Sequence, residues 1–286
     1  MDLDERLAQI GLACAASLGA SLPPPSTAQP ATSLWEQTAP AYPHLDPAGV
    51  QADAARTGWR ILVPGDREWP PVPPGVPDTG EAPWALWVRG DGDLWKATRR
   101  SVAVIGAHAS TPYADHVAAL LGEDLADRGW AVVTSCALGC DTHALAAAAR
   151  GDTPPIAVYA TALDLRACER REPNLPGLLV SDAPPDTPSS RHRSLARQDL
   201  LCYLSAGIVV VEAHFHSTTF AAVYYARRRG RLVMAVPGPI TSSATAATHH
   251  LIRNHDATLV DSADAVSASL LAAMTAPSDP SAGGAR

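Results

Sequence analysis

The stretch SVAVIGAHASTPYADHVAALLGEDLADRGWAVVTSCALGCDTHALAAAARG, Ser101 to Gly151, predicts the fold of this chain. Two apolar runs, SVAVIG and WAVVTS, are rich in β-branched residues and are typical of strands. The first is followed by an amphipathic helical pattern that stops at Gly129. The second is followed by DTHALAAAARG, a helix that Asp141 or Thr142 can cap. Strand and helix therefore alternate twice, which indicates βαβ units.

The alternation continues through the rest of the central region. PIAVYA, GLLVSD, GIVVVEA and RLVMAVPG form four further strand patterns, and STTFAAVYYARRRG forms a helix between the last two. The strands are continuously apolar, which is typical of a parallel sheet that helices cover on both faces. The sequence therefore predicts an α/β fold, a Rossmann-like doubly wound and mostly parallel sheet.

Composition changes along the chain and suggests its domain boundaries. Residues 1–100 hold six of the seven tryptophans and several proline-rich stretches. We expect a short helical element over 1–22, packed loosely or not at all on the rest, and a proline-rich linker over 23–54. A Trp-rich lead-in over 55–100 and the Rossmann-like domain over 101–266 follow. Residues 267–286 are rich in Ala, Ser, Pro and Gly and predict a disordered tail.

Charge and apolar content bound the class of protein. The chain has 286 residues, 47% of them apolar, with no run long enough to span a bilayer and no basic signal-peptide start. We expect a cytoplasmic protein with no membrane contact. The net charge of −7 argues against general nucleic-acid binding. Residues 191–231, however, carry seven arginines against two acidic residues, which is either a local basic face or a set of solvated helix surfaces.

The segment TSCALGCDTHA, Thr134 to Ala144, allows a metal, a redox or a loop interpretation. The five cysteines are odd in number and irregularly spaced, which favours buried thiols over disulfides. A metal held by Cys136 and Cys140 needs two more ligands, and only His143 is near in sequence; the pair His249–His250 lacks a third ligand too. We expect no metal and no cofactor. The segment lies where a strand enters a helix, the end of the sheet at which α/β proteins bind ligands.

Several short motifs, taken in order, resemble one family. They are VPGDREWPPVP with PWALWVRGD, AVIGAHASTPYADHVA, VVTSCALGCDTHALAAAA, LARQDLLCYLSAGIVVVEA, STTFAAVYYARRRGRLVMAVPGPITS and HHLIRNHDATLV. Each alone is weak, but the ordered set over roughly 55–262 is similar to the DNA-processing protein A (DprA/Smf) family. Members bind single-stranded DNA through a basic pocket, form homodimers and load RecA recombinase onto incoming DNA in natural transformation (competence). The resemblance thus implies a binding protein for DNA recombination and not an enzyme.

The resemblance also implies where DNA lies. The loop after the first strand, the turn after the second and the arginine-rich segment should form the walls of the pocket. Arg197 matches the first arginine of the family's F-x-x-R-N-R motif, and Arg197→Ala should weaken binding. The expected DNA-binding residues are Gly106, His108, Ser110, Ser135, Gly139, Asp141, Arg191, Arg193, Arg197 and Gln198.

Departures from the family motifs indicate a partly degenerate pocket. His108 stands where the family has arginine, Ser135 where it has glycine, and Asp199 where it has the second motif arginine. Asp199 reverses the local charge, so Asp199→Arg should strengthen DNA binding. Leu145 and Thr218 also replace motif residues.

Other functions stay open. Related Rossmann-like phosphoribohydrolases carry a PGGxGTxxE loop, but the corresponding EAHFHSTTFAAVYY lacks its glycines and glutamate, which disfavours hydrolysis. A nucleotide-binding sensor of the same superfamily and a dimerisation partner that binds no DNA are the alternatives. Phe220, Tyr224 and Tyr225 form either a surface patch for dimerisation or a core face.

Overall fold

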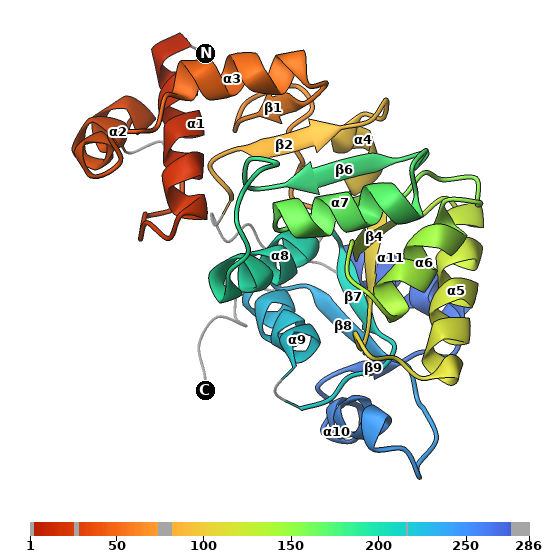
Figure 1. Cartoon of the computed structure of the whole chain (residues 1–286). Helices are drawn as coiled ribbons and strands as arrows, with labels where there is room; N and C mark the ends of the chain where they lie inside the picture. The colour runs from red at the N-terminus through yellow and green to blue at the C-terminus, as the bar shows by residue number, and fades with distance from the viewer. Residues whose placement is uncertain (1–2, 26–28, 74–81, 216, 276–286) are drawn as a thin grey trace.

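The structure, a computed structural model, describes residues 3–25, 29–73, 82–215 and 217–275 (Figure 1). The strands are β1 (Arg60–Leu62), β2 (Leu86–Arg89), β3 (Ser101–Ile105), β4 (Ala131–Ser135), β5 (Ile156–Val158), β6 (Leu178–Ser181), β7 (Gly207–Val210), β8 (Leu232–Ala235) and β9 (Thr258–Leu259). The helices are α1 (Leu3–Ser17), α2 (Ala31–Thr38), α3 (Pro47–Arg56), α4 (Leu94–Thr98), α5 (Pro112–Asp127), α6 (Cys140–Ala148), α7 (Ala162–Arg171), α8 (Arg191–Tyr203), α9 (Thr218–Arg228), α10 (Ala246–Arg253) and α11 (Ala263–Thr275), with short 3-10 helices η1 (Ala39–Ala41) and η2 (Ser243–Thr245).

All nine strands form one sheet in the order β1-β2-β6-β5-β4-β3-β7-β8-β9. The strands from β6 to β9 pair in parallel, which confirms the predicted doubly wound fold. The chain builds outward in one direction from β3 to β6 and in the other from β7 to β9. The reversal falls between β3 and β7, and such a switch point is where open α/β sheets bind ligands.

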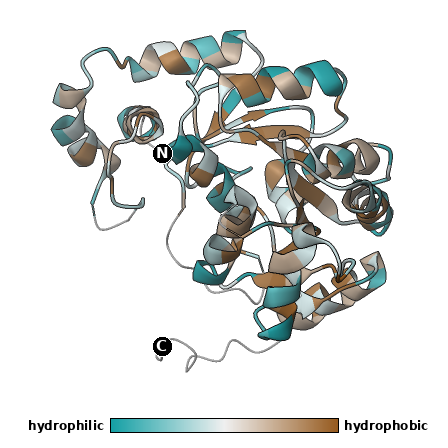
Figure 2. Cartoon of the chain, turned by 60° about the horizontal axis from the view of Figure 1, so that its bottom comes forward, coloured by the Kyte–Doolittle hydropathy of each residue, from teal (hydrophilic) through white to brown (hydrophobic). Residues whose placement is uncertain are grey.

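Alternating residues of the strands supply two cores. Val102 and Val104 of β3 pack under α5, α6 and α11, whereas Ala103 and Ile105 pack under α8 and α9. Every residue of β3 is buried, as expected for a strand covered on both faces. Figure 2 shows the hydrophobic strands enclosed between helices whose outer faces are hydrophilic.

Helix starts follow local sequence. The hydroxyls of Thr111, Thr161, Ser190 and Ser217 each accept a backbone N–H in the first turn of α5, α7, α8 and α9. The predicted cap of α6 was wrong, because Gly139 occupies the N-cap and the Asp141 side chain turns inward.

The N-terminal prediction also needs correction. The segment expected to be a linker contains α2, η1 and α3, and α1 is firmly packed: Ile10 and Leu12 are fully buried in one cluster with Trp59 and Trp87. Arg6 of α1 forms an ion pair with Asp66 at 2.8 Å, and Glu5 accepts the N–H of Ala31 at the start of α2. The tryptophans are responsible, since they give the helices a large apolar surface to cover. Figure 1 shows α1, α2 and α3 grouped at the β1–β2 edge.

The lead-in joins the sheet itself, because β2 pairs antiparallel with β6 and β1 with β2. At the other end, α11 runs to Thr275 and buries Leu270, so the predicted tail is helical at its start. The rest of that prediction, residues 276–286, lies outside the described residues. None of the helices in the described part combines the length and apolar character that a bilayer-spanning segment requires.

Candidate nucleic-acid interface

Two of the three predicted walls lie directly against each other. The loop that follows β3 and the turn that follows β4 are joined by the N–H of Cys140, which donates to the carbonyl of Ala107 at 3.2 Å. Gly139 makes this approach possible: its φ is 81°, and a Cβ there would lie 2.1 Å from the Ala107 oxygen. A residue with a side chain at position 139 would push the two loops apart.

The buried side chain of Asp141 also links the loop after β3 to the turn after β4. One of its carboxylate oxygens accepts the N–H of Gly106 at 3.0 Å, and the other accepts the hydroxyl of Ser135. Burial raises the pKa of Asp141, while the hydrogen bonds from Ser135 and Gly106 and the charge of Arg197 act in the opposite direction. Asp141 and Ser135 therefore position the loops, and the carboxylate does not face outward to repel a phosphate.

Glu212 is a positioning residue that the sequence analysis missed. It follows β7, is fully buried, and accepts both the N–H and the hydroxyl of Thr111 at 3.0 Å each. The hydroxyl of Thr219 donates to the carbonyl of Gly106 at 2.8 Å. The loop 106–110 is thus fixed on both sides of the switch point. A glutamate at the end of the run GIVVVEA was the available signal, since a charge at the end of a buried strand needs a partner.

The arginine-rich segment is arranged differently from the expectation of an open basic wall. The guanidinium of Arg193 is almost fully buried and pairs with Asp182, while Arg197 donates to Asp164 at 3.0 Å. Arg229 pairs with Asp199 at 2.7 Å, and Arg231 donates to the carbonyl of Cys202. Three of the seven arginines of residues 191–231 are therefore paired with carboxylates and largely buried.

The remaining predicted residues differ in exposure. His108 and Arg191 are exposed, and Ser110 donates to the carboxylate of Asp115, which lies 3.5 Å from the imidazole of His143. Gln198 is buried, and its Oε1 has no hydrogen-bond partner among the described residues. The structure thus brings Gly106, Ser135, Gly139, Asp141 and Arg197 to the carboxyl ends of β3, β4 and β5.

The cysteines serve packing in this region. Burial raises the pKa of the Cys140 thiol to about 12, and a hydrogen bond with the Cys168 thiol, together with burial, raises that of Cys136. His249 contacts the backbone of Gly238 through Nε2 at 3.0 Å. Within the described ranges, no three His, Cys, Asp or Glu side chains are grouped as metal ligands.

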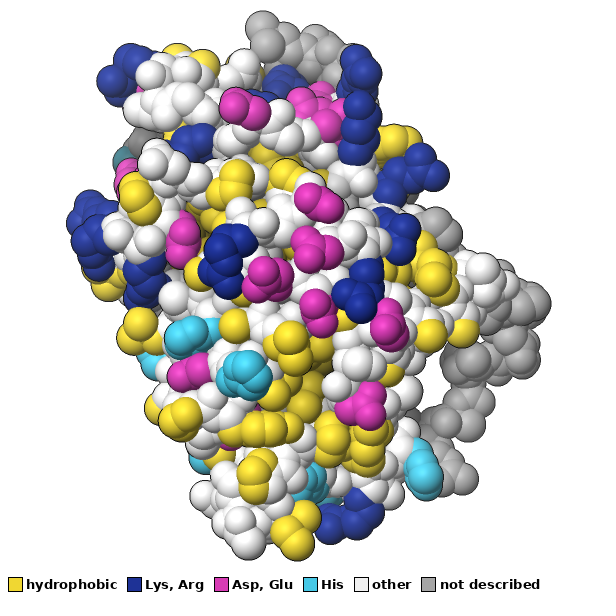
Figure 3. All heavy atoms as spheres, turned by 90° about the vertical axis from the view of Figure 1, so that its right-hand side faces the viewer, with side chains coloured by type: hydrophobic (Ala, Val, Ile, Leu, Met, Phe, Trp, Pro, Cys, Tyr) yellow, Lys and Arg dark blue, Asp and Glu magenta, His cyan; other side chains and the backbone are white. Residues whose placement is uncertain are grey.

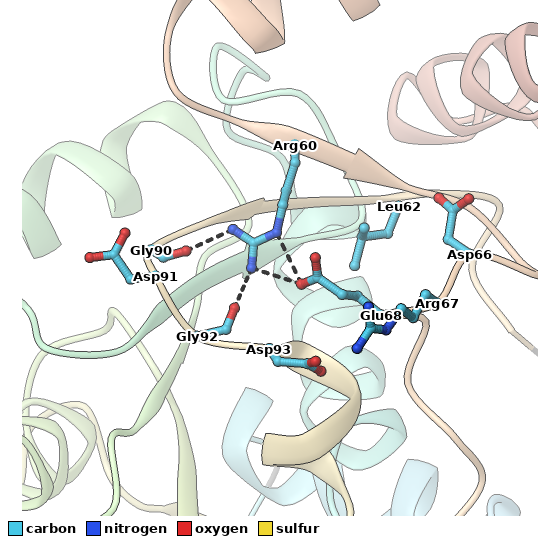
Figure 4. Close-up of a pocket in the computed structure, with 9 residues that line it drawn as sticks. All are labelled: Arg60, Leu62, Asp66, Arg67, Glu68, Gly90, Asp91, Gly92 and Asp93. Carbon is cyan, nitrogen blue, oxygen red and sulfur yellow. Dashed lines mark hydrogen bonds and ion pairs between the residues drawn. The ribbon is translucent and has the colours of Figure 1, made fainter.

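A separate hollow of about 630 Å³ lies beside β1 and the loop after β2 (Figure 4). Because β2 runs antiparallel to β6, this hollow is at the opposite end of the sheet from the switch point. The Arg60 guanidinium at its centre donates to Glu68 and to the carbonyls of Gly90 and Gly92. The Arg60 guanidinium therefore links β1 to the loop that follows β2.

Comparison with known proteins decides the family. The sequence profile of "DNA recombination-mediator protein A" matches residues 60–271. The chain belongs to this family. A DNA processing protein DprA of Mycobacterium tuberculosis is 37% identical over 222 residues, which cover 73% of this chain and 57% of that protein. The protein Smf of Escherichia coli is 33% identical over 199 residues, covering 67% of this chain and 52% of Smf. The chain therefore spans little more than half the length of these relatives.

Solved structures of family members share the fold. DNA processing protein A of Streptococcus pneumoniae superimposes with a TM-score of 0.69 at 26% identity, over 83% of this chain and 81% of that one. The corresponding protein of Helicobacter pylori, described as binding single-stranded DNA in a unique mode, gives a TM-score of 0.61 at 22% identity, over 74% of this chain and 95% of that one.

Family membership gives the departure at Asp199 a structural context. Where the motif has its second arginine, this chain has a carboxylate that accepts two hydrogen bonds, at 2.7 and 2.8 Å, from the buried guanidinium of Arg229. Asp199 and Arg229 are thus a matched pair between α8 and the end of α9. The Asp199 carboxylate therefore serves as a contact between helices in this structure.

Proposed function

We propose that this chain binds single-stranded DNA across the carboxyl ends of β3, β4, β5 and β7 and serves DNA recombination. The observation that carries the proposal is the locked pair of loops at the switch point, held by Gly139, Asp141 and Glu212, in a chain of a recombination-mediator family. A fixed edge of the sheet with an exposed imidazole at His108 and an exposed guanidinium at Arg191 suits a flexible anionic strand.

The binding is weak in this proposal, because the pocket is partly degenerate. Arg193 forms an ion pair with Asp182 and Arg197 forms one with Asp164, and Asp199 replaces a motif arginine. Arg191 and His108 are the exposed residues of the predicted set that can approach a phosphate. Fewer phosphate contacts mean lower affinity and a shallower dependence on salt.

A fluorescence anisotropy titration with a labelled single-stranded oligonucleotide, at low and at moderate salt, tests the proposal. His108→Glu should weaken binding by on the order of 1 kcal/mol, since a carboxylate near a phosphate in water repels it by about that amount. His44→Glu, an equal charge change at an exposed position before α3, is the matched control and should leave affinity unchanged. Absence of binding at low salt, or equal loss in both variants, contradicts the proposal.

We also propose the finer roles that the family resemblance implies, namely homodimer formation and loading of RecA recombinase onto incoming DNA in natural transformation. Tyr224 on α9 is 63% exposed, whereas Phe220 and Tyr225 pack against the core, so Tyr224 is the available contact on that helix. Light scattering should give a dimer mass at micromolar concentration, and Tyr224→Glu should lower it. A monomer mass for the unaltered chain removes the dimer.

The activity proposed is binding rather than catalysis. The loop after β7 lacks the glycines and the glutamate of the phosphoribohydrolase motif. A sensor of small nucleotides uses the same end of the sheet. Separate binding titrations distinguish the two. Binding of a mononucleotide without binding of the oligonucleotide supports the sensor, and binding of the oligonucleotide without binding of the mononucleotide supports the DNA-binding protein.

A further inference from the structure

Exposed apolar side chains lie in the segments that follow β3, β7 and β8 at the carboxyl edge of the sheet. Tyr113 begins α5 after β3, Phe215 follows β7 and Ile240 follows β8, and these three strands are neighbours in the sheet. They are 38%, 43% and 91% exposed. Together with His250 of α10 we call them the aromatic rim. Figure 3 shows the side of the molecule on which α5 and α6 lie, with hydrophobic and histidine side chains in its lower half and more of the charged side chains in its upper half.

The rim is held in place by hydrogen bonds. The Tyr113 hydroxyl donates to the carbonyl of Pro237 at 2.6 Å, and the hydroxyl of Thr245 donates to that of Pro239 at 2.9 Å. Together with the contact of His249 to Gly238, they fix the loop that carries Ile240. A surface that keeps its shape before a ligand arrives loses less entropy on binding.

Two edge-to-face ring contacts orient the side chain of Phe215. Its ring centroid lies 5.4 Å from that of His250, with the planes at 78°, and 5.7 Å from that of Phe220. Edge-to-face packing orients an aromatic ring. Phe215 nevertheless keeps 43% of its surface in contact with solvent, in the segment that follows β7, the strand paired with β3 at the switch point.

The buried arginines of α8 are not available to attract a polyanion to this edge of the sheet. Arg193 and Arg197 are 2% and 8% exposed and pair with carboxylates, and the chain carries a net charge of −7. A polyanion therefore gains little from electrostatic attraction at this edge. Single-stranded nucleic acid offers a second kind of contact, because unpaired bases stack on aromatic side chains whatever their sequence.

We propose that the aromatic rim is a base-stacking subsite, so that this chain holds single-stranded DNA mainly through its bases and only secondarily through its phosphates. The inference rests on the proposed function and specifies how that site distinguishes its ligand. Duplex DNA, whose bases are already stacked and paired, is excluded by this mode of binding. The alternative occupant, a partner protein docking on the same apolar surface, is an outcome of the test.

Anisotropy titrations with a single-stranded oligonucleotide and an abasic oligonucleotide of equal length separate bases from phosphates. The chain should bind the first, and it should bind the second at least about tenfold more weakly, because the abasic strand loses the stacking contacts and keeps the phosphates. Phe215→Ala should weaken binding about tenfold, the size of a lost base–aromatic stack, and Phe215→Trp should restore it. Trp95→Ala, which removes an exposed aromatic residue from α4 at the other end of the sheet, is the matched control and should have no effect.

Ile240→Glu is a second variant that should leave the fold intact, because Ile240 is almost fully exposed. It should also weaken binding, because a carboxylate within the rim repels the strand and replaces an apolar contact. Equal binding of the abasic strand, or Phe215→Ala and Ile240→Glu both behaving like Trp95→Ala, overturns the inference while DNA binding itself stands. No binding of the intact oligonucleotide by the unaltered chain overturns the proposed function instead. Loss of RecA binding without loss of DNA affinity in Ile240→Glu assigns the rim to a protein partner and overturns the inference.

Discussion

The structural role of Asp199 differs from the role that the family motif suggested for this position. From the sequence alone, Asp199→Arg restores a motif arginine and should strengthen DNA binding. In the structure its carboxylate accepts both hydrogen bonds from Arg229, whose side chain is only 5% exposed. The replacement therefore puts two guanidinium groups together and leaves a buried charge without this partner.

We expect Asp199→Arg to lower the free energy of unfolding by about 3 kcal/mol. This value is the lower end of the range for removing one partner of a buried ion pair, and it applies because Asp199 is about one third exposed. Urea unfolding followed by tryptophan fluorescence measures the change. Arg191→Ala, an exposed position at the start of the same helix, should change stability by less than about 0.5 kcal/mol. Unchanged stability together with tighter DNA binding would restore the original expectation.

At the scale of elements, the start of α6 depends on a buried carboxylate. Burial raises the pKa of Asp141 above its ordinary value of 3.8, so between the two values the folded chain binds more protons than the unfolded chain. The contribution of Asp141 to stability is consequently greatest at low pH and is lost as the pH rises through the folded-state pKa. Asparagine has the same shape and can accept from Gly106 and donate to Ser135.

Asp141→Asn should therefore gain stability relative to the unaltered chain as the pH rises above about 4. Chemical unfolding at several pH values between 4 and 7 measures the difference. Asp261→Asn, an exposed carboxylate before α11, is the control and should leave the pH dependence as it is. Parallel pH profiles for Asp141→Asn and the unaltered chain contradict the assignment.

On the scale of the whole molecule, the N-terminal helices are part of the folded body. The sequence suggested a loosely attached element, but Leu12 is fully buried in the cluster that contains Trp59 and Trp87. Leu12→Ala should cost roughly 2–5 kcal/mol, the range for truncating a buried leucine. Leu18→Ala, one residue beyond α1 and 46% exposed, should cost less than about 0.5 kcal/mol. Thermal unfolding compares them, and equally small shifts support loose attachment.

The sequence by itself determined the strands β3 to β8 and the helices α5, α6 and α9, because local apolar patterns specify each βα unit. The position of the switch point between β3 and β7 came from the strand order of the folded sheet. The tertiary structure alone decided which side chains face a ligand. Arg197 and Asp164 are 33 residues apart, and Asp199 and Arg229 are 30 apart, so their pairing depends on how α7, α8 and α9 pack on the sheet. The addition of β1 and β2 depends likewise on the antiparallel edge that β6 offers. Burial and charge neutralisation are properties of neighbours in space, and the spacing of residues along a chain does not record them.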